Sequence, residues 1–503
     1  MKGEGSGQSF GSALPSFFGV RHDKRRPLRY PIAVTALQQT LAAIVGPAHV
    51  LTRPVQLLVY QTDGLPGYEK HPRLAVFPAT PQQVIEVVRA LYAAGASWVA
   101  RGAGTGLSGG ALADDVVLLG LQRLRRIVAI DPEARTATVE PGVVNATLTK
   151  SAAPFGLHYA PDPSSQTACT IGGNVAENAG GPHCLKYGVT LNHVVSAKVV
   201  LPDGALVELI TPESGAGYDL LGAFIGSEGC FGIAYEITVK LTPNPEGIRT
   251  MLADFPTMES AAQATSAIVA AGIVPAALEL MDAATIQAVE ASIYAAGYPT
   301  DAAAVLLVEV DGAEAGLDED VRTIEALCLA HQARGVKVAT MADERTRLWQ
   351  GRKKAFGAMG RVASHLVVQD AVVPRTKLAA ILVQIAEVGT RHRVKVCNVF
   401  HAGDGNLHPN IPYDATNADE ASRVHLAMSE IMELCIAAGG TITGEHGVGL
   451  DKLRYMERLF PGDSLDAMCR LRDAFDPARR ANPGKVVPSH RCREWLSAPG
   501  VEA

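Results

Sequence analysis

The sequence predicts an α+β fold with more than one domain, and three observations carry that prediction. The chain has 503 residues, which suggests roughly two to four domains with separate cores. Residues 73–245 show short strand signals separated by loops of small residues. After Pro245, strand signals alternate with longer helical signals, as expected for a separate α+β domain.

Composition and charge restrict the class of protein. Hydrophobic residues make up 48% and charged residues 19%, as in an ordinary globular protein. The net charge is −6 and no cluster of Lys and Arg suggests a nucleic-acid partner. The least charged run, Ala261–Leu278, contains polar residues and Pro275, so it suits a buried helix rather than a transmembrane segment.

The N-terminus and the cysteines indicate a cytoplasmic chain. The first thirty residues are polar and then basic, so we expect a mobile tail and no signal peptide. The eight cysteines form no C-x-x-C pair, which excludes a zinc ribbon, a ferredoxin-type cluster and a redox dithiol. Scattered thiols fit a reducing compartment. An iron–sulfur or flavoprotein relay for electrons, and any membrane association, would belong to partner subunits.

The first strand-rich stretch begins with a strand, a helix and a second strand. Arg73–Pro78 has the apolar character of a short strand. Thr80 can cap the next helix, and Gln83 completes a capping box. The helix Pro81–Ala93 carries an apolar face, and the next strand, Ser97–Ala100, runs into a glycine-rich loop.

That loop, Arg101–Gly110, predicts an anion-binding site. Its single G-x-G-x-x-G match, at Gly104, Gly106 and Gly109, is weak evidence for a Rossmann fold, which also requires a helix next. Asp115–Leu121 is typical of a strand, so we reject the Rossmann interpretation. Five glycines in ten residues still let successive backbone N–H groups approach a phosphate. The alternative is a flexible loop without a ligand.

Two further small-residue loops lie in the same stretch. Pro161–Ser165 leads into Ile171–Gly181, and Gly226–Gly232 comes later. Between them, Val194–Ile210 is typical of a hairpin with its turn at Pro202–Gly204. Three such loops can line a groove that suits an extended dinucleotide. In the second half of the chain we expect strands at Arg249–Phe255, Ala277–Met281 and Val305–Val310, and helices within Asp343–Arg361 and Ala421–Ala438.

Taken together, the motifs of the chain resemble those of a known family. The motifs are RGAGTGLSGG, PDPSS, IGGNVAENAGG, KYG, GSEGCFGI, HAGDGNLHP, GTITGEHGVG and NPGK. The chain resembles FAD-linked oxidases of the vanillyl-alcohol oxidase/p-cresol methylhydroxylase type, and within them glycolate oxidase catalytic subunits and D-lactate and D-2-hydroxyacid dehydrogenases. Each motif alone is unspecific, but the set is specific.

The resemblance implies a two-subdomain FAD-binding domain, a cap domain of α+β type and a short C-terminal return segment. The implied bounds are 1–49 for a tail and lead-in, 50–247 for the FAD-binding domain, 248–465 for the cap with substrate and metal, and 466–503 for the return segment. The implied FAD contacts are Arg101, Gly102, Gly104, Thr105, Gly106, Leu107, Ser108, Gly109, Gly110, Pro163, Ser164, Gly172, Gly173, Asn178, Gly180, Ile233, Asn406 and Asn482. Some members bind FAD covalently through a histidine. The glycine loop contains none, so we expect non-covalent FAD.

The segment His401–His408, HAGDGNLH, predicts a metal site. Asp404–Gly405 is a strong two-residue hairpin turn, and a hairpin closed there pairs His401 with His408. The imidazoles would share one face with Cβ atoms about 5 Å apart, which suits chelation. Glu445 can supply a third ligand, and the resemblance implies the same trio. Zinc is preferred, with manganese or iron(II) as alternatives, and the competing interpretation is a surface hairpin with unrelated histidines.

An open metal position beside a flavin fits a 2-hydroxy acid. A base would remove the hydroxyl proton while the Cα hydride passes to the flavin N5. His446 is the candidate base, and a structural histidine is the alternative. The family pattern implies that Arg352 binds the substrate carboxylate through its planar fork. Lys353 and Lys354 are expected to form a solvated face.

We therefore predict FAD-dependent oxidation of glycolate or D-lactate to the 2-oxo acid. Relatives that act on 2-hydroxyglutarate carry a basic residue near the position of Val368, so a dicarboxylate is expected to be a poor substrate. The alternatives are a D-2-hydroxyglutarate or other D-2-hydroxyacid dehydrogenase, a metal-independent FAD alcohol oxidase, and a non-catalytic flavin-binding subunit. The paired histidines argue against the alcohol oxidase, and HAGDGNLH together with GEHG argues against the non-catalytic subunit.

Overall fold

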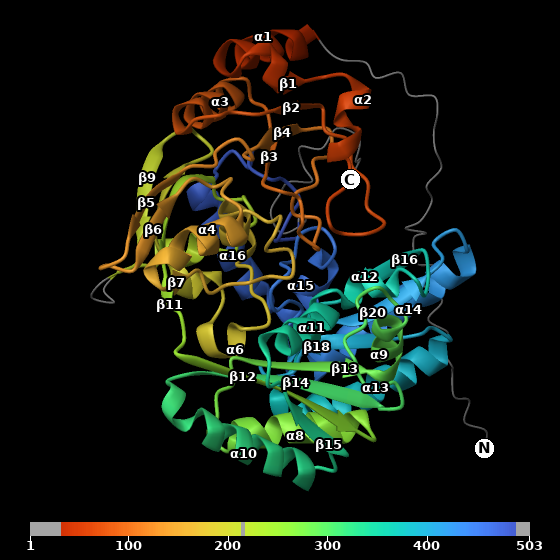
Figure 1. The fold of residues 1–503 in the computed structure, drawn as a ribbon. Helices are drawn as coiled ribbons and strands as arrows, with labels where there is room; N and C mark the ends of the chain where they lie inside the picture. Colours follow the sequence, from red (N-terminus) through yellow and green to blue (C-terminus); the bar gives the residue numbers. More distant parts are fainter. Residues whose placement is uncertain (1–31, 213–216, 489–503) are drawn as a thin grey trace, which may run out of the picture.

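The computed structural model describes residues 32–212 and 217–488, so the mobile tail expected for the first thirty residues lies outside the described residues. Figure 1 shows two halves. The N-terminal half carries a four-stranded and a five-stranded sheet, and the other half is built on a nine-stranded sheet. Helix α15 (Leu453–Leu459) packs with the core of the second half, and α16 (Gly462–Phe475) returns to the first half, where Phe475 stacks on Phe231. The α+β architecture is confirmed.

The first sheet supports the glycine-rich loop. Its strand order is β1-β2-β4-β3, and β2, β4 and β3 run parallel. Helix α3 has the predicted bounds, and Thr80 accepts the N–H of Gln83 at 3.2 Å. The Gln83 side chain accepts from Ala79 rather than from Thr80, so the expected capping box closes one residue earlier. The elements are α1 (Ile32–Val45), β1 (Val50–Leu51), α2 (Pro54–Leu57), β2 (Leu74–Val76), α3 (Pro81–Ala93), β3 (Trp98–Arg101) and β4 (Val117–Gly120).

The second sheet is antiparallel, with the order β5-β6-β10-β8-β9, and it contains the predicted hairpin as β8 and β9. The expected second loop is largely a helix, α5 (Ile171–Glu177). Thr170 caps that helix by accepting the N–H of Gly173, and Asn178 ends it at φ 51°. Because two adjacent glycines and a cap can form a first turn, small residues here did not mean a loop. The other elements are β5 (Ile127–Asp131), β6 (Thr136–Val139), α4 (Asn145–Ala152), β7 (Leu157–His158), α6 (Cys184–Tyr187), β8 (Val194–Val200), β9 (Leu206–Ile210), α7 (Leu220–Phe224), β10 (Ile233–Lys240) and β11 (Thr242–Pro243).

The nine-stranded sheet of the cap is covered on both faces. Alternation along a strand explains this: Leu306 and Val308 of β14 pack in one cluster with α8, α10, α13 and α14, while Val305 and Leu307 pack with α9, α11 and α12. The strands are β12 (Gly247–Phe255), β13 (Ala277–Asp282), β14 (Ala304–Gly312), β15 (Gly335–Val338), β16 (His365–Val368), β17 (Ala371–Val372), β18 (Cys397–His401), β19 (Asn406–Leu407) and β20 (Pro409–Tyr413). The helices are α8 (Met258–Ala270), α9 (Ala283–Glu290), α10 (Glu314–Ala330), α11 (Ala342–Lys353), α12 (Ala355–Met359), α13 (Leu378–His392) and α14 (Ala418–Ala437).

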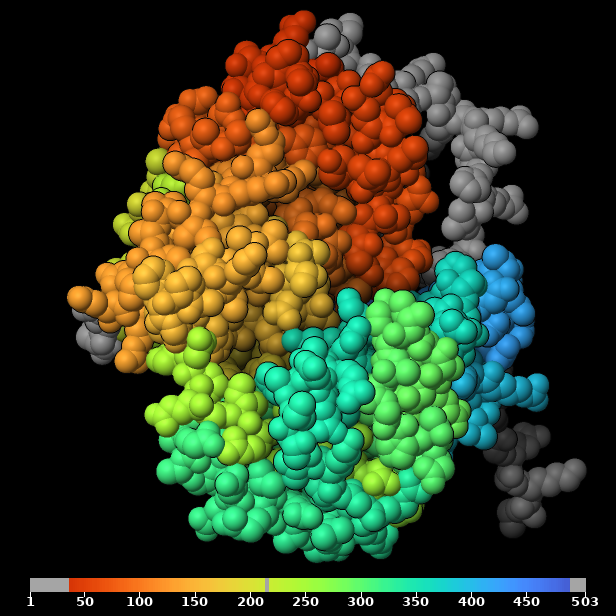
Figure 2. Space-filling model, in the orientation of Figure 1, coloured from red at the N-terminus to blue at the C-terminus, as the bar shows by residue number. Residues whose placement is uncertain are grey.

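The two halves meet along one boundary across the middle of the molecule, visible in Figure 2 between the red-to-yellow and the green-to-blue segments. Polar contacts cross it. Lys353 lies 3.3 Å from Asp162, and His183 lies 3.4 Å from Glu309. His183 also lies 3.0 Å from Asp162 within its own half. Lys353 is therefore an interdomain ion-pair partner and not part of a solvated face, whereas Lys354 is exposed as expected. The sequence did not indicate this because the partner lies far away along the chain.

Candidate active site

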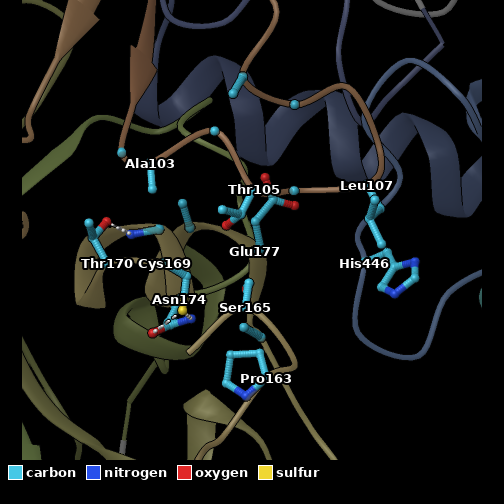
Figure 3. Close-up of a pocket in the computed structure, with 18 of the residues that line it drawn as sticks. Ala103, Thr105, Leu107, Pro163, Ser165, Cys169, Thr170, Asn174, Glu177 and His446 are labelled. Atoms are coloured by element: carbon cyan, nitrogen blue, oxygen red, sulfur yellow. Dashed lines mark hydrogen bonds between the residues drawn. The ribbon is translucent and has the colours of Figure 1, made fainter. Parts of the chain in front are cut away.

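One cavity lies at this boundary and is lined from both halves. The N-terminal half contributes the glycine loop, Pro163–Ser165, the start of α5 and Glu228–Gly229. Figure 3 shows Glu177 and Thr105 facing the same space, with His446 beyond Leu107. The expectation that three separate small-residue segments line one groove is confirmed. From the cap, six side chains reach the same cavity: Arg352, Phe356, His401, His408, Glu445 and His446.

The glycine loop fits an anionic cofactor such as FAD. Within the part of the chain that the structure describes, the backbone N–H groups of residues 102–107 donate no hydrogen bond, so they are available to a ligand. There is no room for a side chain at Gly102, where a Cβ would lie 2.5 Å from the Thr170 hydroxyl. Gly104 has φ 70°, a backbone conformation that other residues rarely adopt. A larger side chain at either position would disturb the loop. Free donors and close backbone approach are what a phosphate cradle requires.

Six of the expected FAD contacts do not line the described cavity, and two of them, Ser108 and Asn482, tie its walls together. The Ser108 carbonyl accepts N–H groups from Leu450 and Asp451, which ties the glycine loop to the cap. Asn482 donates to the carbonyls of Gly110 and Glu228 at 2.9 and 2.5 Å, which ties in the return segment. The six residues are Ser108, Gly109, Asn178, Ile233, Asn406 and Asn482, and the other twelve line the cavity.

The free N–H groups and the absence of histidine from the glycine loop lead to a prediction about FAD attachment. Acid precipitation of the purified yellow protein is expected to release the flavin into the supernatant, because unfolding destroys a cradle made of backbone donors. The measurement is the flavin absorbance of supernatant and pellet. Yellow colour retained by the washed pellet would instead indicate a covalent bond.

The hairpin that carries the two histidines has a register different from the one expected. His401 pairs with Asn406, not with His408, because the connection is the four-residue loop Ala402–Gly405. The N–H of Ala402 donates to Leu278 on the neighbouring strand β13 and is therefore not available to Leu407. The shift is two residues, and side chains alternate with period two, so His408 stays on the same face as His401. Their ring centroids are 5.2 Å apart.

His401, His408 and Glu445 form the predicted trio. Glu445 Oε1 lies 3.3 Å from His401 Nε2 and 3.3 Å from His408 Nε2, and the three ligand atoms lie within 4.8 Å of one another. Hydrogen bonds hold the opposite ring nitrogens: His401 Nδ1 lies 2.7 Å from Glu279, and His408 Nδ1 donates to the Gln369 carbonyl at 3.0 Å. Both Nε2 atoms therefore face the same point, as ligands of one divalent ion require.

A second trio, Asp370, His408 and His446, also lies within 4.8 Å. Asp370 Oδ2 already accepts the hydroxyl of Thr443, the N–H groups of residues 444–446 and the ammonium of Lys452 at 3.0 Å. Asp370 thereby holds the loop that presents Glu445 and His446. His408 reaches a metal only through Nε2, which faces Glu445, so the first trio is the better metal site.

Two functional residues were missed from the sequence, Asp370 and Glu279. Glu279 is fully buried on β13, opposite His401 in the strand register, and its carboxylate lies 2.5 Å from Arg352 Nη2. The available signal was a single acidic residue in the apolar run Ala276–Met281. A buried carboxylate needs a partner, so an isolated one in a strand indicates a paired cation or histidine.

The surroundings of the site favour a neutral His446, a protonated His401 and an ionised Glu445. Burial lowers the pKa of His446 to about 4, and its ring stacks on His408 with centroids 5.0 Å apart. Burial also opposes charge on His401, but Glu279 and Glu445 raise its pKa well above the ordinary value. The pKa of Glu445 is held well below its ordinary value by His401 and His408, against the effect of burial. The negative charge beside two imidazoles suits a cation.

Comparison with known proteins identifies the family. The model of FAD-linked oxidases, C-terminal domain, matches residues 244–486, and an FAD binding domain model matches residues 72–210. Glycolate oxidase subunit GlcD of Escherichia coli (strain K12) is 43% identical over 467 residues, covering 92% of this chain and 93% of that protein. The chain belongs to the FAD-linked oxidase family.

Two other relatives and one solved structure are also similar to this FAD-linked oxidase. GlcD of Bacillus subtilis (strain 168) is 39% identical over 454 residues, covering 90% of this chain and 96% of that protein. The mitochondrial D-lactate dehydrogenase [cytochrome] of Arabidopsis thaliana is 30% identical over 426 residues, covering 84% and 74%. Substrate-bound p-cresol methylhydroxylase has a TM-score of 0.76 at 16% identity, covering 91% of this chain and 98% of that structure, and it supports the predicted fold.

Proposed function

We propose that this FAD-linked oxidase oxidises a small 2-hydroxy acid, glycolate or D-lactate, to the 2-oxo acid with the help of a divalent ion. The observation that carries the proposal is a single cavity that joins the glycine loop to Arg352 and to the trio of His401, His408 and Glu445. Relatives named glycolate oxidase subunit and D-lactate dehydrogenase support the same substrate class.

Each cofactor and each residue would supply one part of the reaction. When bound, FAD supplies the hydride acceptor, and a divalent ion, with zinc preferred over manganese and iron(II), supplies Lewis acidity. Arg352 keeps an unpartnered, buried Nε and offers its remaining donors to the substrate carboxylate. His446 lines the cavity as a neutral imidazole and can take the hydroxyl proton. Glu279 holds His401 and Arg352 in place from behind.

The cap side of the cavity fits one carboxylate better than two. Arg352 is the only lysine or arginine among the described residues that line the cap side, and the next lining residue along the chain is the apolar Phe356 on α12. Val368, on β16, does not line the cavity. The distal carboxylate of a dicarboxylic acid would therefore be buried without a partner, which costs several kcal/mol. Glycolate and D-lactate avoid that cost, and the GlcD relatives favour glycolate.

The location is proposed from the thiols, and the partners are proposed from the chemistry of the flavin. No disulfide joins the seven cysteines among residues 32–212 and 217–488, and reduced thiols support the proposal of a reducing cytoplasmic location. No helix in those ranges has the length and apolar character needed to cross a bilayer. Electrons leaving the flavin would pass to an acceptor or to partner subunits with flavin or iron–sulfur groups.

Anaerobic addition of glycolate or D-lactate is expected to bleach the flavin absorbance, followed by turnover with an artificial acceptor. The values of kcat/KM for glycolate, D-lactate and D-2-hydroxyglutarate then test the size argument. We expect D-2-hydroxyglutarate to be the poorest by about tenfold or more, a difference of about 1.4 kcal/mol. A tenfold preference for the dicarboxylate would overturn the argument, and a flavin that no 2-hydroxy acid bleaches would overturn the proposed function.

A further inference from the structure

Glu177 is an acidic side chain in the cavity with no assigned role. It ends helix α5 and is half-buried, with part of its surface in the cavity. Its Oε2 is fully buried and has no hydrogen-bond partner among the described residues. In Figure 3 the carboxylate lies near Thr105 of the glycine loop. An ionised carboxylate in such a place would lack the donors that normally stabilise it.

Glu228 lies beside Glu177 and has the opposite environment. It accepts the N–H of Val448 at 2.6 Å and the N–H of Gly449 at 3.1 and 2.8 Å. Burial raises the pKa of Glu228, but the two backbone N–H donors oppose this effect, and Glu177 Oε2 has no such donor among the described residues. Glu228 is therefore the member of the pair that ionises first. The same hydrogen bonds also fasten the cap segment after His446 to the FAD-binding half.

The two carboxyl groups flank the same two glycines. A Cβ on Gly110 would lie 2.7 Å from Glu177 Oε1 and 3.2 Å from Glu228 Oε2. A Cβ on Gly447 would lie 2.6 Å from Glu177 Oε2 and 2.7 Å from Glu228 Oε1. Glycine at both positions, one from each half of the molecule, lets the two acids approach each other.

The other charged groups around Glu177 do not neutralise it. Asp63 adds a third carboxylate, and Lys452 is bonded to Asp370. Lys485 donates to the Leu112 carbonyl at 2.8 Å and to Asn482 at 3.0 Å. Burial, and then the charge of Glu228, raise the pKa of Glu177 well above its ordinary value. When two carboxyl groups share a site, one of them keeps its proton.

We propose that Glu177 keeps its proton beside the ionised Glu228 and donates a hydrogen bond from its O–H to FAD in the cavity. A neutral acid at this point adds a donor to the backbone cradle without adding a charge that would repel the phosphates. The inference rests on the proposed placement of FAD. It makes Glu177 a positioning residue for the cofactor.

The test is the FAD dissociation constant of the holoenzyme as a function of pH, from flavin fluorescence after dilution. The wild type should bind FAD most tightly at low pH, where Glu177 is protonated. Above the pKa of the FAD-free form, affinity should fall by about tenfold per pH unit, because one proton is required for binding. Glu177→Gln keeps a neutral donor of the same shape at every pH and should lose that step. Glu133→Gln, at an exposed glutamate of the same half, is the matched control and should keep it.

An unchanged pH step in Glu177→Gln would overturn the inference. So would a wild type without a step and a variant that binds FAD more weakly at every pH, because that pattern indicates an ionised acceptor. Should the variant not fold, infrared spectra of the wild-type holoenzyme in H₂O and D₂O decide, since a buried neutral acid shows a carbonyl band that shifts on deuteration. Absence of that band overturns the inference. A protein that binds no FAD refutes the proposed function itself.

Discussion

Replacing His401 or His408 by alanine is expected to remove a stoichiometric divalent ion and nearly all turnover, while FAD remains bound. The two Nε2 atoms and Glu445 Oε1 form the trio, so losing one imidazole leaves too few ligands. The Lewis acid supplies several kcal/mol, so kcat should fall by about a thousandfold or more. FAD should stay because its cradle belongs to the other half of the molecule.

Elemental analysis, flavin absorbance and turnover measure the three parts of this result. His71→Ala, at an exposed histidine remote from the trio, is the control and should keep both metal and activity. Glu279→Gln separates ligand loss from ligand orientation. It leaves the trio intact but weakens the hold on His401 Nδ1, so the expected loss in metal affinity is about 10- to 100-fold. Fully active wild-type protein without a divalent ion would refute the metal proposal.

Replacing Arg352 by methionine is expected to lower both activity and stability. Glu279 would lose its cation and remain buried, and breaking one partner of a buried ion pair costs about 3–5 kcal/mol. The substrate carboxylate would lose a charge-assisted hydrogen bond of about 1.5–3 kcal/mol, so kcat/KM should fall by about 10- to 100-fold or more. Denaturant unfolding and steady-state kinetics measure the two effects separately.

Arg352→Lys distinguishes the two roles of this residue. A lysine restores a charge beside Glu279 and should recover most of the stability, but a point charge cannot replace the planar fork, so KM should stay raised. Arg347→Lys, at an exposed arginine on the same helix, is the matched control and should change neither quantity. A normal KM in Arg352→Lys would show that Arg352 only supports Glu279 and does not bind substrate.

Much of the local structure could be predicted because it depends on neighbours in sequence. Helix α3 has its predicted bounds, since Thr80, Pro81 and the apolar spacing all lie within thirteen residues. The strand after the glycine loop excluded a Rossmann fold for the same reason. The segment Ile171–Gly181 was predicted as a loop from its small residues, and the structure forms a helix there because Thr170 caps its first turn.

The amino-acid sequence by itself determined which chemical groups are available: a glycine-rich loop, two histidines in one short segment, a glutamate in a later glycine-rich loop, and the motifs of an FAD-linked oxidase. Tertiary structure decided how these groups are held. The register of the histidine hairpin depends on an N–H donated to Leu278, and the ligand orientation depends on Glu279. Asp370 and the pair of Glu177 and Glu228 acquire their roles only when distant segments meet. The physical reason is that hydrogen bonds and burial act through space, and the local sequence does not encode which remote side chain will satisfy a buried charge.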